Sequence, residues 1–151
     1  VDVFQKVATA AAAVLDRSLP ALIAGTAPRR PQDLTQGGYF GGRTPADGRI
    51  DWRRSAREVH NLVRGVAPPY PGAFTMLDGK TLKILGTRPA TGRAPPATPA
   101  IYSNGTDCFA ACCDGSVLRI VAMEYAAQPF SAADFLARFG PAPIHLEATW
   151  Q

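Results

Sequence analysis

The stretch IDWRRSAREVHNLVRGVAPPYPGAFT, residues 50–75, decides the fold that we expect for this chain. Ser55 and Glu58 form an S-x-x-E pattern, which is the capping box that begins many helices. Apolar side chains then recur at helical spacing as far as about Val66, and a Pro-Pro-Tyr-Pro-Gly run ends the helix sharply. A strand follows from Phe74. The stretch therefore predicts a helix, a rigid turn and a strand in direct succession.

Short strands fill the sequence after this stretch. Five are expected, at residues 74–77, 81–87, 100–102, 108–112 and 117–123. Asp78-Gly79 and Asp114-Gly115 are typical hairpin turns, and residues 88–99, with four prolines, are expected to be a loop. Ser131 begins a final short helix that Gly140 ends. Together these elements predict an α+β, mainly β fold, which is a partly open barrel of the OB type.

The residues before this barrel have a different character. Residues 2–25 predict one amphipathic helix, in which Pro20 should introduce a kink or a break. Residues 26–48 hold three prolines and five glycines without a period, which indicates a linker or an extended arm. We therefore expect a helix at 1–25, a linker at 26–36 and a folded domain at 37–151.

Composition narrows the class of protein. Hydrophobic residues make up 46% of the chain and charged residues 19%, which is usual for a globular domain. The apolar run at residues 8–15 is too short to cross a bilayer, and Asp16 and Arg17 follow it directly. We expect neither membrane insertion nor a secretory signal.

The cysteines are Cys108, Cys112 and Cys113, an odd number with two of them adjacent. This pattern argues against a disulfide framework and favours reduced thiols in a cytoplasmic protein. With His60 and His145 as the only histidines, we expect no metal site.

Arginine dominates the charge. The net charge is +4, and residues 29–64 hold eight arginines against four acids. Such a surplus favours a polyanion, which could be RNA, a nucleotide diphosphate or the phosphate-rich end of a cofactor. A solvated basic face is the alternative interpretation of the same count.

Few residues are candidates for chemistry. His60 shares a helical face with Arg64, which should lower the basicity of the ring, and a structural role for His60 is the more common one. Asp47 and Asp51 lie four residues apart in a turn-rich segment, so shared catalytic geometry is not implied. No Ser-His-Asp set and no glycine-rich phosphate loop is present, so no catalytic residue is expected.

The run Tyr39-Phe40-Gly41-Gly42-Arg43 is a candidate binding segment. Aromatic rings can stack on a planar group, glycines allow close approach, and arginine can hold phosphate. The alternative is a short aromatic anchor that pins the linker to the domain.

Three groups of residues resemble the C-terminal domain of the folate-dependent formyltransferases: Ile50-Asp51-Trp52, His60-Asn61 and Pro71-Gly72-Ala73-Phe74-Thr75. That family includes methionyl-tRNA formyltransferase and the sugar-nucleotide N-formyltransferases. The resemblance extends over residues 1–125. Within it, YFGGRTPADG at residues 39–48 is most similar to the enzymes that formylate UDP-4-amino-4-deoxy-L-arabinose, a nucleotide sugar of lipid A modification.

The resemblance implies transfer of a formyl group from 10-formyltetrahydrofolate to the amine of a sugar nucleotide. In the family, an Asn-His-Asp set in an N-terminal Rossmann-like domain performs this step and binds the folate. No stretch of this chain matches that set, and His60-Asn61 matches a position of the C-terminal domain instead. We therefore expect residues 1–25 to be the last helix of a missing catalytic domain, and the piece alone to be inactive. Tyr39, Phe40 and Arg43 would lie near the acceptor substrate.

Two other functions stay open. The arginine surplus also suits the C-terminal domain of methionyl-tRNA formyltransferase, with tRNA as the partner. A free-standing OB-like module for single strands is the third reading, although the strands carry few aromatic residues. The apolar face of the first helix could also pair with a second copy of the chain.

Overall fold

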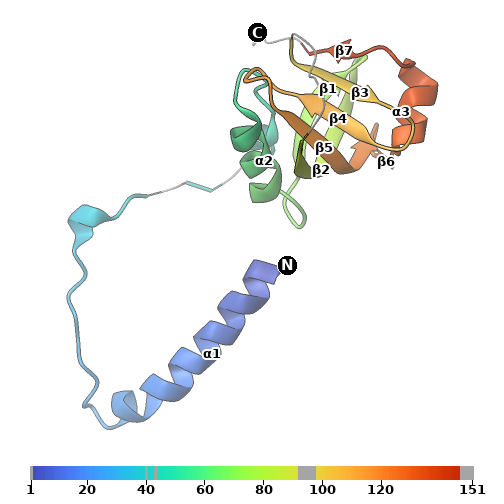
Figure 1. Ribbon diagram of the computed structural model, residues 1–151. Coiled ribbons are helices and arrows are strands. Elements are labelled where there is room, and N and C mark those ends of the chain that lie inside the picture. Colours follow the sequence, from blue (N-terminus) through green and yellow to red (C-terminus); the bar gives the residue numbers. More distant parts are fainter. Residues whose placement is uncertain (1, 40, 43, 92–97, 147–151) are drawn as a thin grey trace. The chain divides into compact units, whose positions relative to one another are not determined.

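The computed structural model describes residues 2–39, 41–42, 44–91 and 98–146 (Figure 1). The chain divides into two compact units, Val1–Gly41 and Gly42–Gln151. We call the first unit the helical arm and the second the barrel domain.

The helical arm consists of a long helix, α1 (Asp2–Ile23), and a single 3-10 turn, η1 (Leu34–Gln36). Helix α1 continues through Pro20 as one element, so the expected break into two helices is absent. The helix ends where it was predicted to end. Gly25 adopts a positive φ of 69°, and the amide of Thr26 donates to the carbonyl of Ala21 at 2.9 Å.

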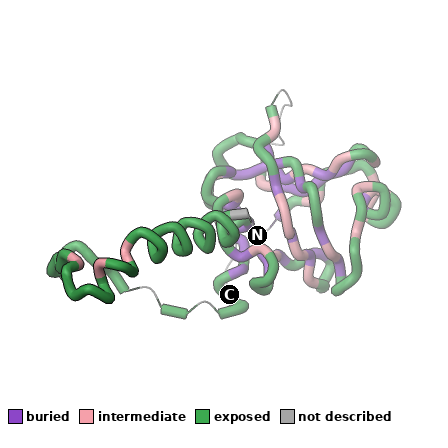
Figure 2. Tube along the Cα trace, turned by 90° about the horizontal axis from the view of Figure 1, so that it is seen from below, coloured by how far each residue is buried: buried purple, intermediate pink, exposed green. Residues whose placement is uncertain are grey.

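The apolar side chains of α1 are exposed. Figure 2 shows the helix almost entirely in the colour of exposed residues, and Phe4 and Ile23 expose 78% and 79% of their surface. The exposed stripe consists of Val3, Phe4, Val7, Val14, Leu15, Leu19, Leu22 and Ile23. A stripe of this kind is stable in water only when another surface covers it, so α1 is built to pack against something.

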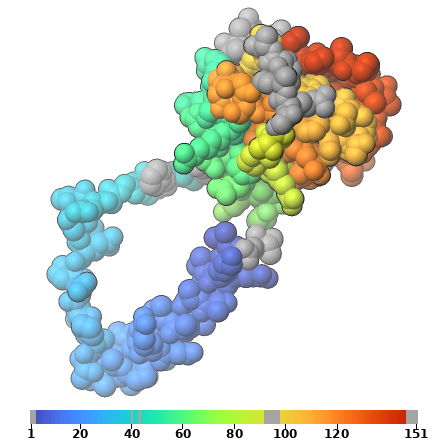
Figure 3. Space-filling view, in the orientation of Figure 1, coloured from blue at the N-terminus to red at the C-terminus, as the bar shows by residue number. Residues whose placement is uncertain are grey.

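The barrel domain is a curled antiparallel sheet with two helices, which confirms the predicted α+β, OB-like fold. The strand order is β1-β2-β5-β4-β3-β7, and β6 pairs with β5. The strands are β1 (Ala73–Leu77), β2 (Lys80–Ala90), β3 (Ala100–Ser103), β4 (Cys108–Ala111), β5 (Val117–Tyr125), β6 (Gln128–Pro129) and β7 (Ile144–His145). The pairings of β2 with β5 and of β3 with β7 join strands that are distant in sequence, so segments of different colour lie side by side on the surface of the domain (Figure 3).

Two strands and part of a third were not predicted. Strands β6 and β7 are two residues long, which is too short for an alternating pattern to show in the sequence. Strand β2 extends to Ala90 although residues 88–90 were expected to be loop. Pairing with β5 explains the extension, because Pro89 lies opposite Leu118 and Ala90 opposite Val117. The expected loop at residues 92–97 lies outside the described residues.

A local bulge interrupts the pairing of β2 with β5 at Gly86. Gly86 pairs with Ala122, out of register, whereas Ile84 pairs with Met123 and Thr87 with Ile120 in the same register before and after it. A Cβ atom on Gly86 would lie 2.9 Å from a methyl group of Val121, closer than real contacts allow. The bulge adds to the curvature of the sheet at this point.

Helix α2 (Ala56–Gly65) and helix α3 (Ala132–Phe139) close the core, and Figure 1 shows them at opposite ends of the sheet. Both begin with a complete capping box, formed by Ser55 with Glu58 and by Ser131 with Asp134. Helix α2 packs on β2 through its buried apolar face, and α3 packs on β3. The side chains most deeply buried are Phe135, Leu82, Ile84, Ile101, Leu118, Val63 and Cys108.

The aromatic cluster under α3 gives a test of the core. Phe135 is fully buried, and its ring centre lies 4.9 Å from that of Phe139 and 6.3 Å from that of Phe130. Phe135→Ala should lower the free energy of unfolding by about 3–5 kcal/mol, because it leaves a cavity in a packed cluster. Guanidinium unfolding followed by tryptophan fluorescence measures this loss.

The matched control is Phe4→Ala, which removes the same atoms from a side chain that is 78% exposed. We expect that control to change the free energy of unfolding by less than about 0.5 kcal/mol. Equal effects of the two substitutions would contradict the assignment of Phe135 to the core.

Candidate functional site

The candidate site lies beside α2, where the chain enters the barrel domain. We call residues 44–52, which lead the chain into this domain, the entry segment. The 3-10 turn η2 (Pro45–Gly48) begins at Thr44, whose amide and hydroxyl both donate to the carboxylate of Asp47, at 2.6 Å and 3.0 Å. The chain then runs along the edge of β1. There the amide of Ile50 donates to the carbonyl of Phe74 at 2.8 Å.

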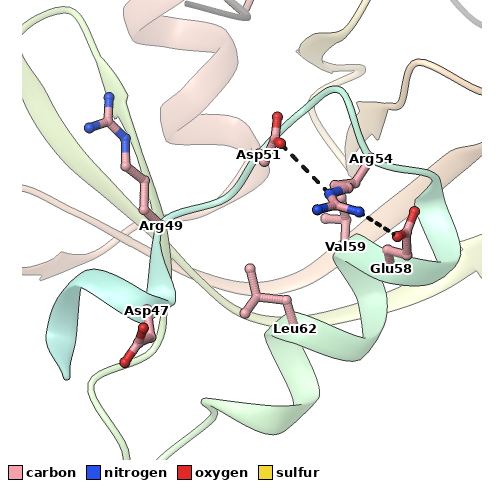
Figure 4. Close-up of a pocket in the computed structure, with 7 residues that line it drawn as sticks. All are labelled: Asp47, Arg49, Asp51, Arg54, Glu58, Val59 and Leu62. Carbon is pink, nitrogen blue, oxygen red and sulfur yellow. Dashed lines mark hydrogen bonds and ion pairs between the residues drawn. The ribbon is translucent and has the colours of Figure 1, made fainter. Parts of the chain in front are cut away.

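A pocket of about 280 Å³ opens between this entry segment and α2 (Figure 4). The entry segment contributes its polar side, and α2 contributes Val59 and Leu62, of which Leu62 points into the space between the two walls. The lining residues are Asp47, Arg49, Asp51, Arg54, Glu58, Val59 and Leu62. The pocket thus has an apolar floor and a rim of charged groups of both signs.

Asp51 is the centre of the charged rim. Its carboxylate accepts two hydrogen bonds from the guanidinium of Arg53, at 2.9 Å and 3.0 Å, and Arg54 lies 3.7 Å away. The hydrogen bond from Arg53 holds the pKa of Asp51 below its usual value, against the opposing effect of burial. Asp51 therefore stays ionised and anchors the two arginines.

Glu58 is held in the same way on the other side of Arg54. The side-chain hydroxyl and the amide of Ser55 donate to Glu58, and Arg54 donates to it at 3.1 Å. The hydrogen bond from the Ser55 hydroxyl lowers the pKa of Glu58. Asp51 and Glu58 are therefore ionised near neutral pH and engaged by neighbouring arginines.

Of the predicted binding residues, only Tyr39 lies among the described residues. It belongs to the helical arm, and 96% of its surface is exposed. Phe40 and Arg43 lie outside the described residues.

The pocket itself escaped prediction from the sequence. The T-P-x-D pattern from Thr44 to Asp47 signals a capped turn, but nothing in it shows that the turn lies beside α2. Asp47 and Asp51 both line the pocket, yet each is engaged by its own neighbour, Thr44 or Arg53. They do not form a catalytic pair.

His60 faces the sheet, as expected for a structural histidine. Its Nδ1 lies 2.8 Å from the hydroxyl of Thr87 on β2, so the partner is a strand side chain rather than a carbonyl. Burial lowers the pKa of His60, and the charge of Arg64 lowers it further. The predicted effect of Arg64 is therefore present, although burial is the larger cause.

The three cysteines are free thiols. Cys108 and Cys112 are buried, and burial raises the pKa of each to about 12. The thiol of Cys113 is exposed and donates to the carbonyl of Arg53 at 2.7 Å, which joins the turn after β4 to the entry segment. Buried Cys108 and Cys112 thus behave as small apolar residues.

Two further observations concern the described residues as a whole. Within them, no group of three or more histidine, cysteine or acidic residues could hold a metal ion. Among the same residues, no helix has the length and apolar character needed to span a membrane.

A second pocket, of about 250 Å³, lies at the edge of β5. There Arg119 pairs with Asp107 at 3.0 Å. Phe130 and Ser131 also line this pocket. Its charged groups satisfy each other, and no candidate binding residue from the sequence lies in it.

Comparison with known protein families identifies this arrangement. A family model described as "Formyl transferase, C-terminal domain" matches residues 43–140. The matched range includes η2, α2, strands β1 to β6 and α3, and therefore the whole lining of the pocket beside α2.

The lowered pKa of His60 predicts how stability depends on pH. The pKa of the folded state lies below the ordinary value of 6.5, so the unfolded chain binds the proton first as the pH falls. The contribution of neutral His60 is complete above about pH 6.5 and decreases below it. The free energy of unfolding should therefore fall between about pH 7.5 and pH 5.5, measured by urea unfolding at each pH.

His60→Asn should flatten the pH dependence in this window, because it removes the titrating ring. His145→Asn is the matched control, since His145 is exposed and bonded to Thr98. A pH profile that is the same for wild type and for His60→Asn would contradict this account of His60.

Proposed function

Because the chain belongs to the formyl transferase C-terminal domain family, we propose that it is the non-catalytic, acceptor-contacting part of a sugar-nucleotide formyltransferase. The intact enzyme would transfer a formyl group from 10-formyltetrahydrofolate to the amine of a substrate of the UDP-4-amino-4-deoxy-L-arabinose type. The observation that supports this acceptor is the run YFGGRTPADG at residues 39–48. It places an exposed aromatic ring and an arginine directly before the pocket beside α2 in the sequence.

The chemistry of the run suits a nucleotide. Tyr39 is exposed and offers a face for stacking on a planar base, and Arg43 can hold a diphosphate through charge-assisted hydrogen bonds. Glycines between them leave room for close approach of a ligand, because a Cβ atom on Gly41 or Gly42 would meet nothing within 4 Å. Phe40 completes the proposed binding set of Tyr39, Phe40 and Arg43.

The two pockets described above are small for a folate. Small-molecule sites usually measure about 300–1,000 Å³, and these pockets measure about 280 Å³ and 250 Å³. We derive no catalytic step from them and propose that a separate N-terminal domain binds 10-formyltetrahydrofolate and performs the transfer.

The exposed apolar stripe of α1 supports the proposal of a separate catalytic domain. A helix whose Phe4, Leu15 and Leu22 are exposed needs an apolar surface to cover it. We propose that residues 1–25 are the last helix of the catalytic domain, with residues 26–36 as the linker to the domain at 37–151. In the isolated chain, a second copy would be the available cover.

A second acceptor class is favoured by one observation. Arg49, Arg57 and Arg64 are exposed on the entry segment and on α2, as a surface for RNA phosphates would require. This observation supports the C-terminal domain of a methionyl-tRNA formyltransferase, for which tRNA is the partner. Asp51 and Glu58 pair with Arg53 and Arg54 on the same segment and helix, which lowers the positive charge available to phosphates there.

Arg43→Ala in the intact enzyme tests the sugar-nucleotide acceptor. The loss of a charge-assisted hydrogen bond to phosphate should raise KM for the nucleotide about tenfold or more, with a smaller effect on kcat. Steady-state formylation kinetics measure both constants. Arg57→Ala is the control, because Arg57 lies on α2 outside the binding run.

The tRNA acceptor predicts the opposite pattern. In that case the chain should bind tRNA in fluorescence anisotropy, with an affinity that falls steeply between about 50 mM and 200 mM salt. Arg57→Ala should then weaken binding about as much as Arg43→Ala. An unchanged KM in Arg43→Ala would remove Arg43 from the proposed site, and absence of tRNA binding at low salt would dismiss the second acceptor.

The proposed role of α1 is tested by the mass of the isolated chain in solution. Without a catalytic domain to cover the stripe, the 16.0 kDa chain should associate with rising concentration. Leu15→Glu should restore the monomer, because it places a charge in the stripe. Thr9→Glu, on the opposite face of α1, should leave association unchanged, and sedimentation equilibrium distinguishes the two. A wild-type chain that stays monomeric at high concentration would contradict the proposal that the apolar stripe of α1 needs another surface to cover it.

A further inference from the structure

Two arginines lie opposite each other on the face of the sheet that points away from the core, which we call the outer face. Arg88 of β2 and Arg119 of β5 are partners in the strand register, and β5 lies between β2 and β4 (Figure 1). Leu118 and Ile120, on either side of Arg119, belong to the core, so Arg119 and its partner point to the outer face. Their Cβ atoms are about 5 Å apart in such a pair, and two like charges at that distance repel each other.

The charge of Arg88 is not balanced by a neighbour. Among the residues that the structure describes, no acid pairs with Arg88, which is exposed. Lys83 lies on the same face of β2 but differs in this respect, because it is opposite Glu124. The sheet therefore keeps one uncompensated arginine directly beside a second arginine. This pair does not stabilise the empty domain, whereas it would stabilise a bound anion.

Arg119 is held in place by an acid. Asp107, directly before β4, contacts Nε of Arg119 at 3.0 Å, and half of the Arg119 side chain is exposed. A guanidinium group carries five N–H donors. Within the described part of the chain no other acid pairs with Arg119, so its terminal nitrogens are available to a second acceptor. Asp107 thus restrains the guanidinium group without occupying all of its donors.

Arg119 belongs to a pocket as well as to the arginine pair. Together with Asp107 it lines the pocket of about 250 Å³ at the edge of β5. The lining also includes Thr106 and Ser131, which carry hydroxyl groups, and Val121, which is 45% exposed. A ligand whose anionic group lies between the two arginines can therefore extend its remaining atoms into a space that offers both polar and apolar contacts.

A phosphate monoester fits this arrangement best. It carries between one and two negative charges at neutral pH, and its oxygens match the paired donors of a guanidinium group. It can therefore contact Arg88 and Arg119 together. A nucleic-acid strand fits less well, because it requires a run of cations along its backbone. Lys83, the next cation on this face of β2, is opposite an acid.

We propose that Arg88 and Arg119 bind the phosphate group of a small phosphate ester, whose remaining atoms occupy the pocket at the edge of β5. The site lies wholly within the barrel domain. It is independent of the acceptor proposed above, so each of the two proposals can fail without the other.

An NMR titration of the full chain tests the site. The Nε–Hε signals of the arginine side chains are followed while inorganic phosphate, or ribose 5-phosphate, is added at constant ionic strength. The signals of Arg88 and Arg119 should shift and saturate, whereas that of Arg57 on α2 should not. Ribose 5-phosphate should bind about threefold or more tightly than inorganic phosphate, because its sugar gains contacts in the pocket.

Arg88→Gln and Lys83→Gln are a matched pair, since each removes one positive charge from the same face of β2. Arg88→Gln should weaken phosphate binding about tenfold, the loss expected for a hydrogen bond between charged groups. Lys83→Gln should change it less than about twofold, because exposed charges outside the site are screened. Arg88→Lys keeps the charge but loses the planar fork, and should still weaken binding about threefold. Circular dichroism of the Arg88 variants should match that of the wild type, because Arg88 is exposed.

Four results would overturn the proposal. Signals of Arg88 and Arg119 that do not move with phosphate remove the anion site. Equal losses in Arg88→Gln and Lys83→Gln reduce it to the general charge of the domain. Ribose 5-phosphate that binds no more tightly than inorganic phosphate removes the pocket from the site. Oligothymidylate that binds more tightly than ribose 5-phosphate, with an affinity that falls steeply with salt, assigns the surface to nucleic acid instead.

Discussion

The burial of the segment at residues 49–52 against β1 is the constraint on which the rest of this domain depends. The segment lies along an edge strand: Arg49 bridges to Phe74, and the indole of Trp52 donates to the hydroxyl of Thr75 at 3.1 Å. Ile50 and Trp52 are 5% and 3% exposed, so the same residues that cover the edge also enter the core. An open strand edge is a site for unwanted pairing, and here it is closed by the chain's own entry segment.

Much else follows from this burial. It places the start of α2 near the turn after β4, where the carboxylate of Asp114 accepts from the amide of Ala56 at 3.1 Å. It brings the charged rim of the pocket over Val59 and Leu62. One short segment therefore joins the edge of the sheet, the beginning of a helix and the candidate site.

The fold was predictable from local signals that act within a few residues. The Ser55 and Ser131 capping boxes, the Gly25 helix end and the Asp78-Gly79 turn are all present, the last with φ values of 50° and 69°. These features depend on backbone chemistry that one turn of chain can satisfy by itself. Strands β6 and β7 were missed because their two residues carry no period, and they exist only through pairing with β5 and β3.

The candidate site was less predictable, because a count of charged residues does not show which of them form ion pairs. Residues 29–64 hold twice as many arginines as acids, yet Asp51 engages Arg53 and Arg54, and Glu58 engages Arg54 again. Two of the eight arginines, Arg53 and Arg54, are thus engaged by acids and contribute less to a surface for phosphates. Composition alone gives the sign of the charge on a surface but not the strength of its electrostatic potential. Only the fold shows which arginines lie beside an acid.

The bulge at Gly86 has a consequence for the parity of β2. Strand residues normally alternate between the two faces, and Leu82 and Ile84 point into the core. The irregular pairing at Gly86 shifts this alternation by one residue, so that Thr87 instead of Gly86 faces inward, where its hydroxyl meets His60. The local geometry of β2 therefore matters as much as the identity of its residues. With strict alternation, Gly86 would face inward and Thr87 outward, which would leave a ring nitrogen under α2 facing a strand that offers it no hydroxyl.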